Sequence, residues 1–111
     1  MLVGYLRQAN FPQESYATIQ LVCGGETRIS VEDFDRLSKF NWTLKKSFYR
    51  YYVGRWTKKN GKRKFIFMHR DICGCPDDRV VHHVNHVTTD NRRTNLQILT
   101  DYEHKEYHSW R

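Results

Sequence analysis

Residues 80–104 read VVHHVNHVTTDNRRTNLQILTDYEH, and this stretch decides how the chain is organised. It holds four of the six histidines and a pair of arginines between two short apolar runs. Val80 and Val81 predict a short buried strand that ends in His82 and His83. Because neighbouring strand side chains point to opposite faces, both imidazoles can serve one site only if the strand stops or twists there.

The second half of the stretch predicts a return of the chain and a helix. Residues 85–91 are polar and long enough to fold back as a loop, and residues 96–99 are typical of a returning strand. Residues 100–103, TDYE, have the pattern of a capping box, which places His104 in the first helical turn and His108 one turn later on the same face. The predicted order is therefore strand, loop, strand, helix.

This arrangement resembles the HNH nucleases, whose ββα-metal unit is similar in order and spacing. Residues 80–100 look like the family's V-D-H-I-N-G…D-N-R…N-L…T pattern, and its His, Asn and final metal-binding residue match His83, Asn95 and His104. Upstream, MHRDICGCP at residues 68–76 resembles the segment that precedes the motif in small phage and intron-type HNH homing endonucleases. The likeness covers most of the chain after residue 16.

The resemblance implies a metal-dependent DNA endonuclease that hydrolyses phosphodiester bonds. His83 would be the general base, because a neutral imidazole near pH 7 suits removal of a proton from the attacking water. His82 and His104 would hold one divalent cation, which would bind a non-bridging oxygen of the scissile phosphate and stabilise the leaving 3′ oxygen. Asn95 would hydrogen-bond the loop backbone and keep the end of the His83 strand in place.

The sequence departs from the family pattern at two positions near the expected metal site. His82 stands where the family usually has a metal-binding Asp, so the site loses a negative charge. Mg, Mn, Ni and Zn are the candidate ions, and imidazole favours Mn, Co, Ni or Zn over Mg. His86 stands where the family often has Gly, so it would perturb the loop or add a ligand.

The upstream half predicts a basic platform. Asn60-Gly61 predicts a type I′ turn between a strand that includes residues 49–53 and a partner strand over 64–68. The turn is flanked by five cations, Lys58, Lys59, Lys62, Arg63 and Lys64. Such a tip either stays in water or meets phosphate, and the segment alone leaves both open. The tyrosines and Trp56 of this hairpin are expected in the core rather than stacked on bases.

The remaining segments predict the platform's other parts. Residues 16–23 and 26–29 predict a hairpin about Gly24-Gly25, residues 31–39 an amphipathic helix with Ser30 as N-cap, and residues 41–45 a short strand. We therefore expect an α+β fold of one domain. It would have an irregular arm over 1–15, a hairpin and helix platform over 16–76, and the catalytic unit over 77–109.

Charge and apolar patterning bound the partners. Nineteen Lys and Arg against twelve Asp and Glu leave a net charge of +7, which favours a polyanion such as DNA. The resemblance also implies that Arg92 and Arg93 clamp phosphate, which a guanidinium can meet bidentately. We find no membrane span or secretion signal in the sequence and expect a protein that acts in the cytoplasm. Double-strand cleavage would need a homodimer or two successive nicks.

Each assignment has a structural alternative. His69, His86 and His108 are expected to be surface or satisfied core residues, and Asp90-Asn91 could simply build a turn that Arg92 pairs across. The three cysteines, Cys23, Cys73 and Cys75, are expected to be small buried thiols rather than half of a zinc site. The alternative function is a non-catalytic DNA-binding module of the same ancestry, in which the histidines bind a structural zinc.

Overall fold

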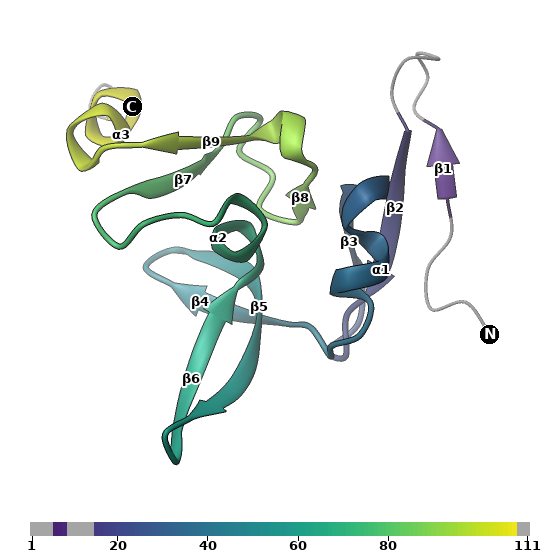
Figure 1. Cartoon of the computed structure of the whole chain (residues 1–111). Coiled ribbons are helices and arrows are strands. Elements are labelled where there is room, and N and C mark those ends of the chain that lie inside the picture. The colour runs from purple at the N-terminus through teal and green to yellow at the C-terminus, as the bar shows by residue number, and fades with distance from the viewer. Residues whose placement is uncertain (1–5, 9–14, 109–111) are drawn as a thin grey trace.

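The computed structural model describes residues 6–8 and 15–108, with side chains over 15–104. The fold is α+β with mostly antiparallel strands, as expected (Figure 1). The elements in order are β1 Leu6–Gln8, β2 Ser15–Gln20, β3 Glu26–Ser30, the 3-10 helix η1 Val31–Asp33, α1 Phe34–Leu37, β4 Thr43–Ser47, β5 Arg50–Lys59, β6 Lys62–Phe67, α2 Met68–Cys73, β7 Val80–His83, β8 Asp90–Asn91, η2 Arg93–Asn95, β9 Leu96–Leu99 and α3 Asp101–His108.

The first sheet joins the N-terminal strands to the loop that follows the histidine pair. Its strand order is β1-β2-β3-β8, with antiparallel pairing except for β3 and β8, which run parallel. Arg28 pairs with Asp90 and Ile29 with Asn91. The short strand β8 therefore ties the loop after the histidine pair to the N-terminal half of the molecule.

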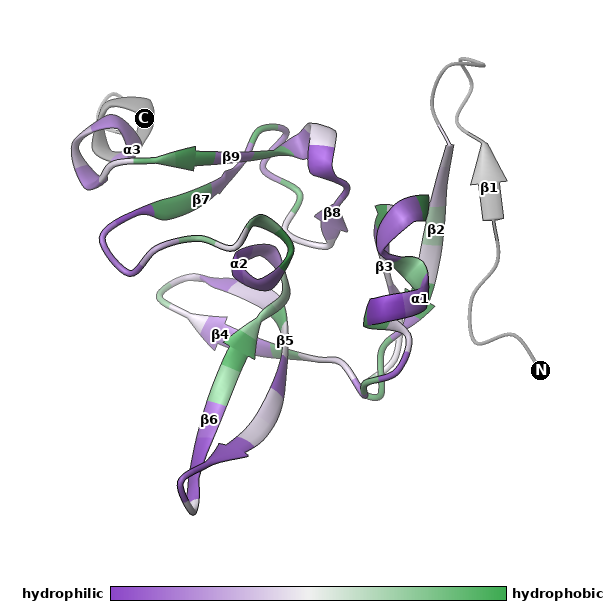
Figure 2. Ribbon diagram, in the orientation of Figure 1, coloured by the Kyte–Doolittle hydropathy of each residue, from purple (hydrophilic) through white to green (hydrophobic). Residues whose placement is uncertain are grey.

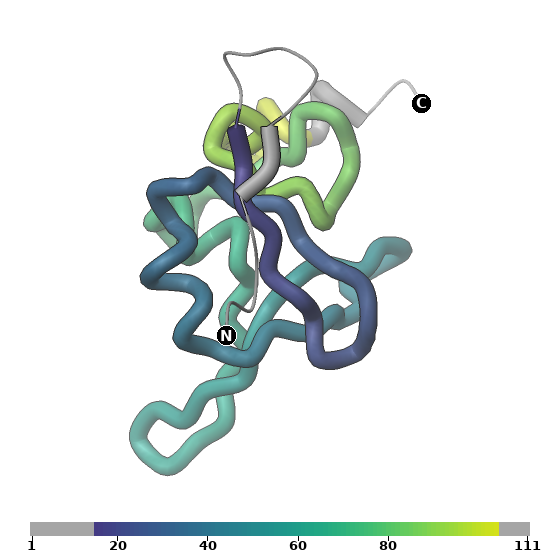
Figure 3. Tube along the Cα trace, turned by 90° about the vertical axis from the view of Figure 1, so that its right-hand side faces the viewer, coloured from purple at the N-terminus to yellow at the C-terminus, as the bar shows by residue number. Residues whose placement is uncertain are grey.

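A second sheet, β4-β5-β6, carries the basic hairpin. Asn60 and Gly61 both have positive φ angles, 54° and 77°, which confirms the type I′ turn. Figures 1 and 3 both show the β5–β6 hairpin projecting from the rest of the molecule, and Figure 2 colours its tip hydrophilic.

The stretch at 80–104 forms strand, loop, strand and helix. β7 and β9 pair antiparallel, with His82 opposite Gln97 and His83 opposite Leu96. The capping box is present: the backbone N–H of Glu103 donates to Thr100 Oγ1 at 3.1 Å, and Glu103 Oε1 accepts from the Thr100 N–H at 2.8 Å. These two hydrogen bonds fix where α3 begins, and therefore where His104 lies beside β7.

One apolar core lies between the first two sheets and the helices. Trp42 is fully buried, and its Nε1 donates a hydrogen bond to the Leu37 carbonyl at 2.7 Å. The other buried members of this core are Ala17, Ile19, Leu21, Ile29, Leu37, Val53, Met68 and Ile72. Among the described residues, no helix is long and apolar enough to cross a membrane.

The structure corrects several local predictions. Residues 68–73 form the helix α2, which the sequence did not indicate, and the strand expected over 64–68 lies at 62–67. The expected arm is not wholly irregular, because Leu6–Gln8 pairs with β2; residues 1–5 and 9–14 of that arm lie outside the described residues. The helix expected over 31–39 is a 3-10 turn followed by the four-residue α1.

Ser30 stands at the N-terminus of η1 but does not cap it with its side chain. Its hydroxyl instead accepts the backbone N–H of Arg93 at 2.9 Å. The tertiary contact has taken the oxygen that the local pattern assigned to the helix start.

Candidate functional site

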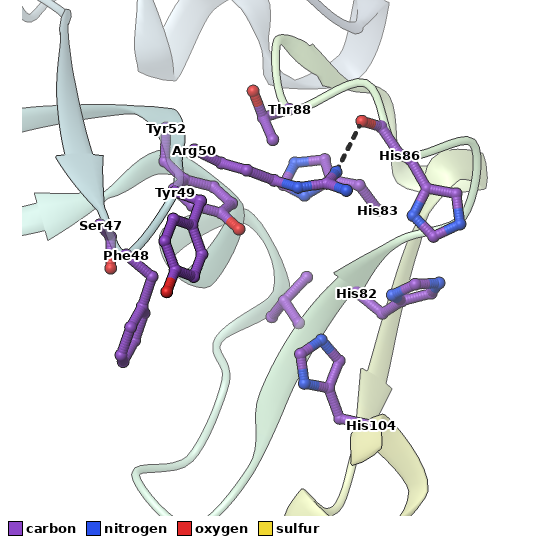
Figure 4. A pocket seen from close by; sticks show the side chains of 11 residues that line it. Ser47, Phe48, Tyr49, Arg50, Tyr52, His82, His83, His86, Thr88 and His104 are labelled. Atoms are coloured by element: carbon purple, nitrogen blue, oxygen red, sulfur yellow. Dashed lines mark hydrogen bonds between the residues drawn. The ribbon is translucent and has the colours of Figure 1, made fainter. Parts of the chain in front are cut away.

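A pocket of about 280 Å³ lies between the β4–β5 turn and β7. Figure 4 shows Phe48 and Tyr49 on one side, the imidazoles of His82, His86 and His104 on the other, and Arg50 reaching across toward His83. Its volume is near the lower end of the range for ligand-binding clefts, roughly 300 Å³. The two consecutive histidines of β7 both line this pocket, although they contact different neighbours.

His82 lies between two other imidazoles. Its ring centroid is 5.7 Å from that of His104 and 5.2 Å from that of His86. Two imidazoles that share a tetrahedral ion at about 2.1 Å have ring centres roughly 5 Å apart, so the donor chemistry and the spacing of His82 and His104 fit one cation. In the part of the chain with described side chains, no group of three or more His, Cys, Asp or Glu forms a metal site. His108 lies in α3, but its side chain is outside the described residues.

His83 is buried on the inner side of β7, at 5 % exposure. Its ring packs 5.0 Å from His69 and 6.0 Å from Tyr52, measured between centroids. Burial lowers the pKa of His83 below its usual value, and a hydrogen bond to Asn91 partly opposes that shift. The imidazole is therefore held as the neutral form at pH 7.

A chain of hydrogen bonds decides which ring nitrogen of His83 carries the proton. The Thr89 carbonyl can only accept, so the Thr27 hydroxyl donates to it, at 2.8 Å. Thr27 Oγ1 then accepts from Asn91 Nδ2 at 3.0 Å, which leaves Asn91 Oδ1 as the acceptor for His83 Nε2 at 2.8 Å. The ring proton is thereby placed on Nε2, and Nδ1 keeps its lone pair.

Asn95 fastens the loop that follows His83. Its Oδ1 accepts the backbone N–H of Asn85 at 2.9 Å, and its Nδ2 donates to the Asp90 carbonyl at 2.8 Å and to Asn85 Oδ1 at 2.9 Å. The hydrogen bonds expected of Asn95 to the loop backbone are thus present. Its contribution to catalysis stays a prediction.

The two arginines are each engaged by a carboxylate. Arg92 binds Asp90 with Nε and Nη2, both at 2.7 Å, so the pair considered in the sequence is present. Arg93 binds the buried Asp33 with Nε at 2.9 Å and Nη2 at 2.8 Å. The Asp33 carboxylate raises the pKa of Arg93. Both guanidiniums therefore help to hold the loop in place, and their contact with phosphate stays a prediction.

The five cations of the basic hairpin are all exposed and lie outside the pocket lining. Arg63 lies over the Trp56 ring at 4.2 Å. The expectation that the aromatics of this sheet are core residues is wrong for three of them: Tyr49, Tyr51 and Trp56 are exposed. Tyr49 lies in the turn before β5, and Tyr51 and Trp56 are five positions apart in that strand, so their side chains leave opposite faces of the sheet.

Two of the minor histidine and cysteine expectations also change. His69 is buried as expected of a core histidine, but its Nδ1 has no hydrogen-bond partner among the described residues, and burial lowers its pKa to about 3. His86 is exposed, as expected. The three cysteines are unpaired, and the expectation that all are buried is wrong, because Cys23 is exposed and Cys73 and Cys75 are half-buried.

Sequence reasoning missed Arg50 and Asn91 as members of the site. Arg50 lines the pocket and donates from Nη1 to the His86 carbonyl at 3.2 Å. Asn91 is fully buried against His83. No local pattern marks either residue, since Arg50 begins an ordinary hairpin strand and Asn91 follows Asp90 in what looks like a turn.

The comparisons with known proteins identify no family for this chain. No family model, no curated protein and no solved structure matches it.

Proposed function

We propose that the protein is a metal-dependent DNA endonuclease of the HNH type. The observation that supports this best is that the ring centroids of His82 and His104 lie 5.7 Å apart, beside a neutral His83. All three imidazoles line one pocket. These residues come from β7 and α3, and the resemblance in sequence assigns them the ligand and base roles. The net charge of +7 suits a polyanionic substrate.

The proton chemistry follows from the hydrogen bonds of His83. With its Nε2 proton bound to Asn91, the Nδ1 atom is the base. Water attacks phosphorus as its proton passes to Nδ1; the bond from phosphorus to the 3′ oxygen breaks, and that oxygen takes a proton from solvent. The products are a 5′ phosphate and a 3′ hydroxyl.

His82 and His104 are the residues that would hold the cation. When bound there, a divalent cation supplies Lewis-acid stabilisation of charge on the phosphoryl and leaving oxygens. Arg50 faces the same pocket, and its guanidinium has donors besides the one bound to the His86 carbonyl. Arg50 would therefore orient a non-bridging phosphate oxygen.

Plasmid cleavage by the unmodified protein and by His83→Ala tests this proposal. We expect cutting in Mn, Co, Ni or Zn and weaker cutting in Mg, because the two ligands are imidazoles. The His83→Ala variant should lose at least a hundredfold in rate, roughly the contribution of a general base, and retain its affinity for DNA. No cutting by the unmodified protein in any of these metals would refute the nuclease and leave a DNA-binding module with a structural metal.

A further inference from the structure

The β4–β5 turn presents two aromatic rings that folding does not explain. Ser47 pairs with Arg50, so Phe48 and Tyr49 alone form the two-residue loop. They are 91 % and 95 % exposed. Single exposed apolar residues are ordinary on protein surfaces, but two adjacent aromatic rings at a tip bury almost no area for the fold.

The backbone at this turn is also unfavourable for its sequence. Phe48 has a φ of 57°, in the left-handed region, where a residue with a bulky side chain is uncommon. A two-residue hairpin loop with positive φ at its first position favours Gly. Strain that the fold does not need is characteristic of binding and catalytic sites.

The turn is held against the candidate active site. Arg50, the residue after the loop, donates to the His86 carbonyl at 3.2 Å, and the Thr88 hydroxyl donates to the Tyr51 carbonyl at 2.6 Å. Phe48 and Tyr49 line the same pocket as His83, and Figure 4 shows them across it from the imidazoles. A phosphate bound at the imidazoles would therefore bring its nucleoside toward the two rings.

The charges beside the turn fit a nucleic acid. Lys46 is exposed on β4, two residues before Phe48, and Arg50 follows the loop; the Lys45 ammonium lies instead over the Trp56 ring, at 4.8 Å. Aromatic rings between cations match a strand whose bases are stacked on protein while its phosphates meet Lys and Arg. An apolar peptide or a second copy of this cationic chain would not use that charge.

We propose that Phe48 and Tyr49 form a stacking site for a nucleic-acid base that has left its own stack next to the scissile phosphate. This inference rests on the proposed nuclease function and specifies its substrate: single-stranded DNA, or duplex with an unpaired or unstacked base at the cleavage position. Base-on-aromatic stacking tolerates every base, so the site selects for exposure of the base and not for its identity.

Equilibrium binding in EDTA, where no cleavage occurs, tests the stacking site. The probe is a short single-stranded oligothymidylate with one 2-aminopurine, whose emission falls when the base stacks on an aromatic ring. We expect Phe48→Gly and Tyr49→Ala each to weaken binding about tenfold and to reduce the quenching, since one stacked base contributes that order of affinity. Tyr49→Phe should bind as the unmodified protein does.

Tyr102→Ala is the matched control, because Tyr102 is a 73 % exposed aromatic outside the pocket lining. Its affinity should not change. Phe48→Gly relieves the strained φ, so its melting temperature should equal or exceed that of the unmodified protein; a lower one with the same loss of binding would assign Phe48 a structural role and overturn the site.

Two further outcomes separate this inference from the nuclease proposal. If the unmodified protein binds the probe and both variants bind within twofold of it, the stacking site is refuted and the nuclease proposal stands. If the unmodified protein binds neither this probe nor duplex DNA, both proposals fail together.

Discussion

The two turns of the β4-β5-β6 sheet obey opposite rules. The β5–β6 turn places Asn60 and Gly61 at positive φ, where these residues are favoured, and surrounds them with exposed cations. The β4–β5 turn places Phe48 at positive φ, where Gly is favoured, and leaves two aromatic rings in water. Both turns end hairpins of the same three-stranded sheet.

This difference between the turns distinguishes a sequence that the fold alone explains from one that a bound ligand would explain. The β5–β6 tip needs no partner to account for its sequence, because an unstrained turn and solvated lysines are sufficient. The β4–β5 tip departs from local preference next to the pocket that holds the histidines. Local departures of this kind are expected at functional positions rather than spread evenly over a fold.

The largest expected effect is a loss of folding stability at acid pH, caused by the buried His69 where the two hairpins meet. His69 packs against Tyr52 of β5 and Phe67 of β6, and burial lowers its pKa from 6.5 to about 3. The folded state therefore binds fewer protons than the unfolded state between these values. The contribution of His69 to stability is complete above pH 6.5 and falls by about 1.4 kcal/mol per pH unit below it, which gives roughly 2 kcal/mol between pH 7 and pH 5.

Urea denaturation at pH 7 and pH 5 measures this loss. His69→Phe keeps a ring in the same position and removes the titrating group, so its stability should fall less over the same interval. The other ionisable groups are common to both proteins, so their effects cancel in the comparison. An equal fall in the two proteins would show that His69 is not the group responsible.

The next largest effect distinguishes the two tips by their salt dependence. Replacing Lys58, Lys59 and Lys62 by Ala removes cations that would meet phosphate, so affinity for duplex DNA should fall roughly tenfold at moderate salt. The slope of log affinity against log salt should fall by about 1 for each phosphate that no longer meets a lysine. Tyr49→Ala should weaken binding of the single-stranded oligothymidylate with its salt slope unchanged, because stacking releases no counterions. If the triple variant kept the same dependence of affinity on salt, the lysines of the β5–β6 tip would contact solvent and not phosphate.

The smallest effect compares the strain in the two turns directly. Gly61→Ala introduces a Cβ at a φ of 77° with nothing within 4 Å of it, so it should lower the free energy of unfolding by about 1 kcal/mol through backbone strain alone. Phe48→Gly should raise it by about 0.5 to 1 kcal/mol, since Gly suits the first position of such a turn. Thermal or urea unfolding of both variants gives the sign of each change in the free energy of unfolding. If both variants changed it in the same direction, the two turns would not differ in backbone strain.

The sequence predicts those parts of the fold that short-range chemistry determines. The Asn60-Gly61 turn and the capping box at Thr100 are set by residues within one turn of each other, and both are present. The helix α2 was missed because it is six residues long and has no side-chain cap at Phe67. The pairing of β3 with β8 was missed because it joins residues about sixty positions apart, which no local pattern encodes.

The candidate site was predictable only in part for the same reason. The spacing of the motif and its family resemblance placed His82 beside His104, and the structure puts their ring centroids 5.7 Å apart. The sequence did not indicate that Asn91 binds His83 or that Arg93 binds Asp33. Asn91 is positioned by its pairing with β3, and Asp33 belongs to η1, so both contacts depend on segments far away in the chain. Arg50 lines the pocket because the β4–β5 hairpin packs against the loop that holds His86 and Thr88. Packing of this kind leaves no periodic pattern in the sequence.

The hydrogen bond between Thr27 and Thr89 has a consequence for biosynthesis. These residues are 62 positions apart, and through Asn91 they orient the imidazole of His83. A contact of such high order forms late, after the entropy of closing the intervening loop has been overcome. On the ribosome, the imidazole of His83 therefore cannot be held in this orientation until residues 89–91 have been synthesised and have emerged.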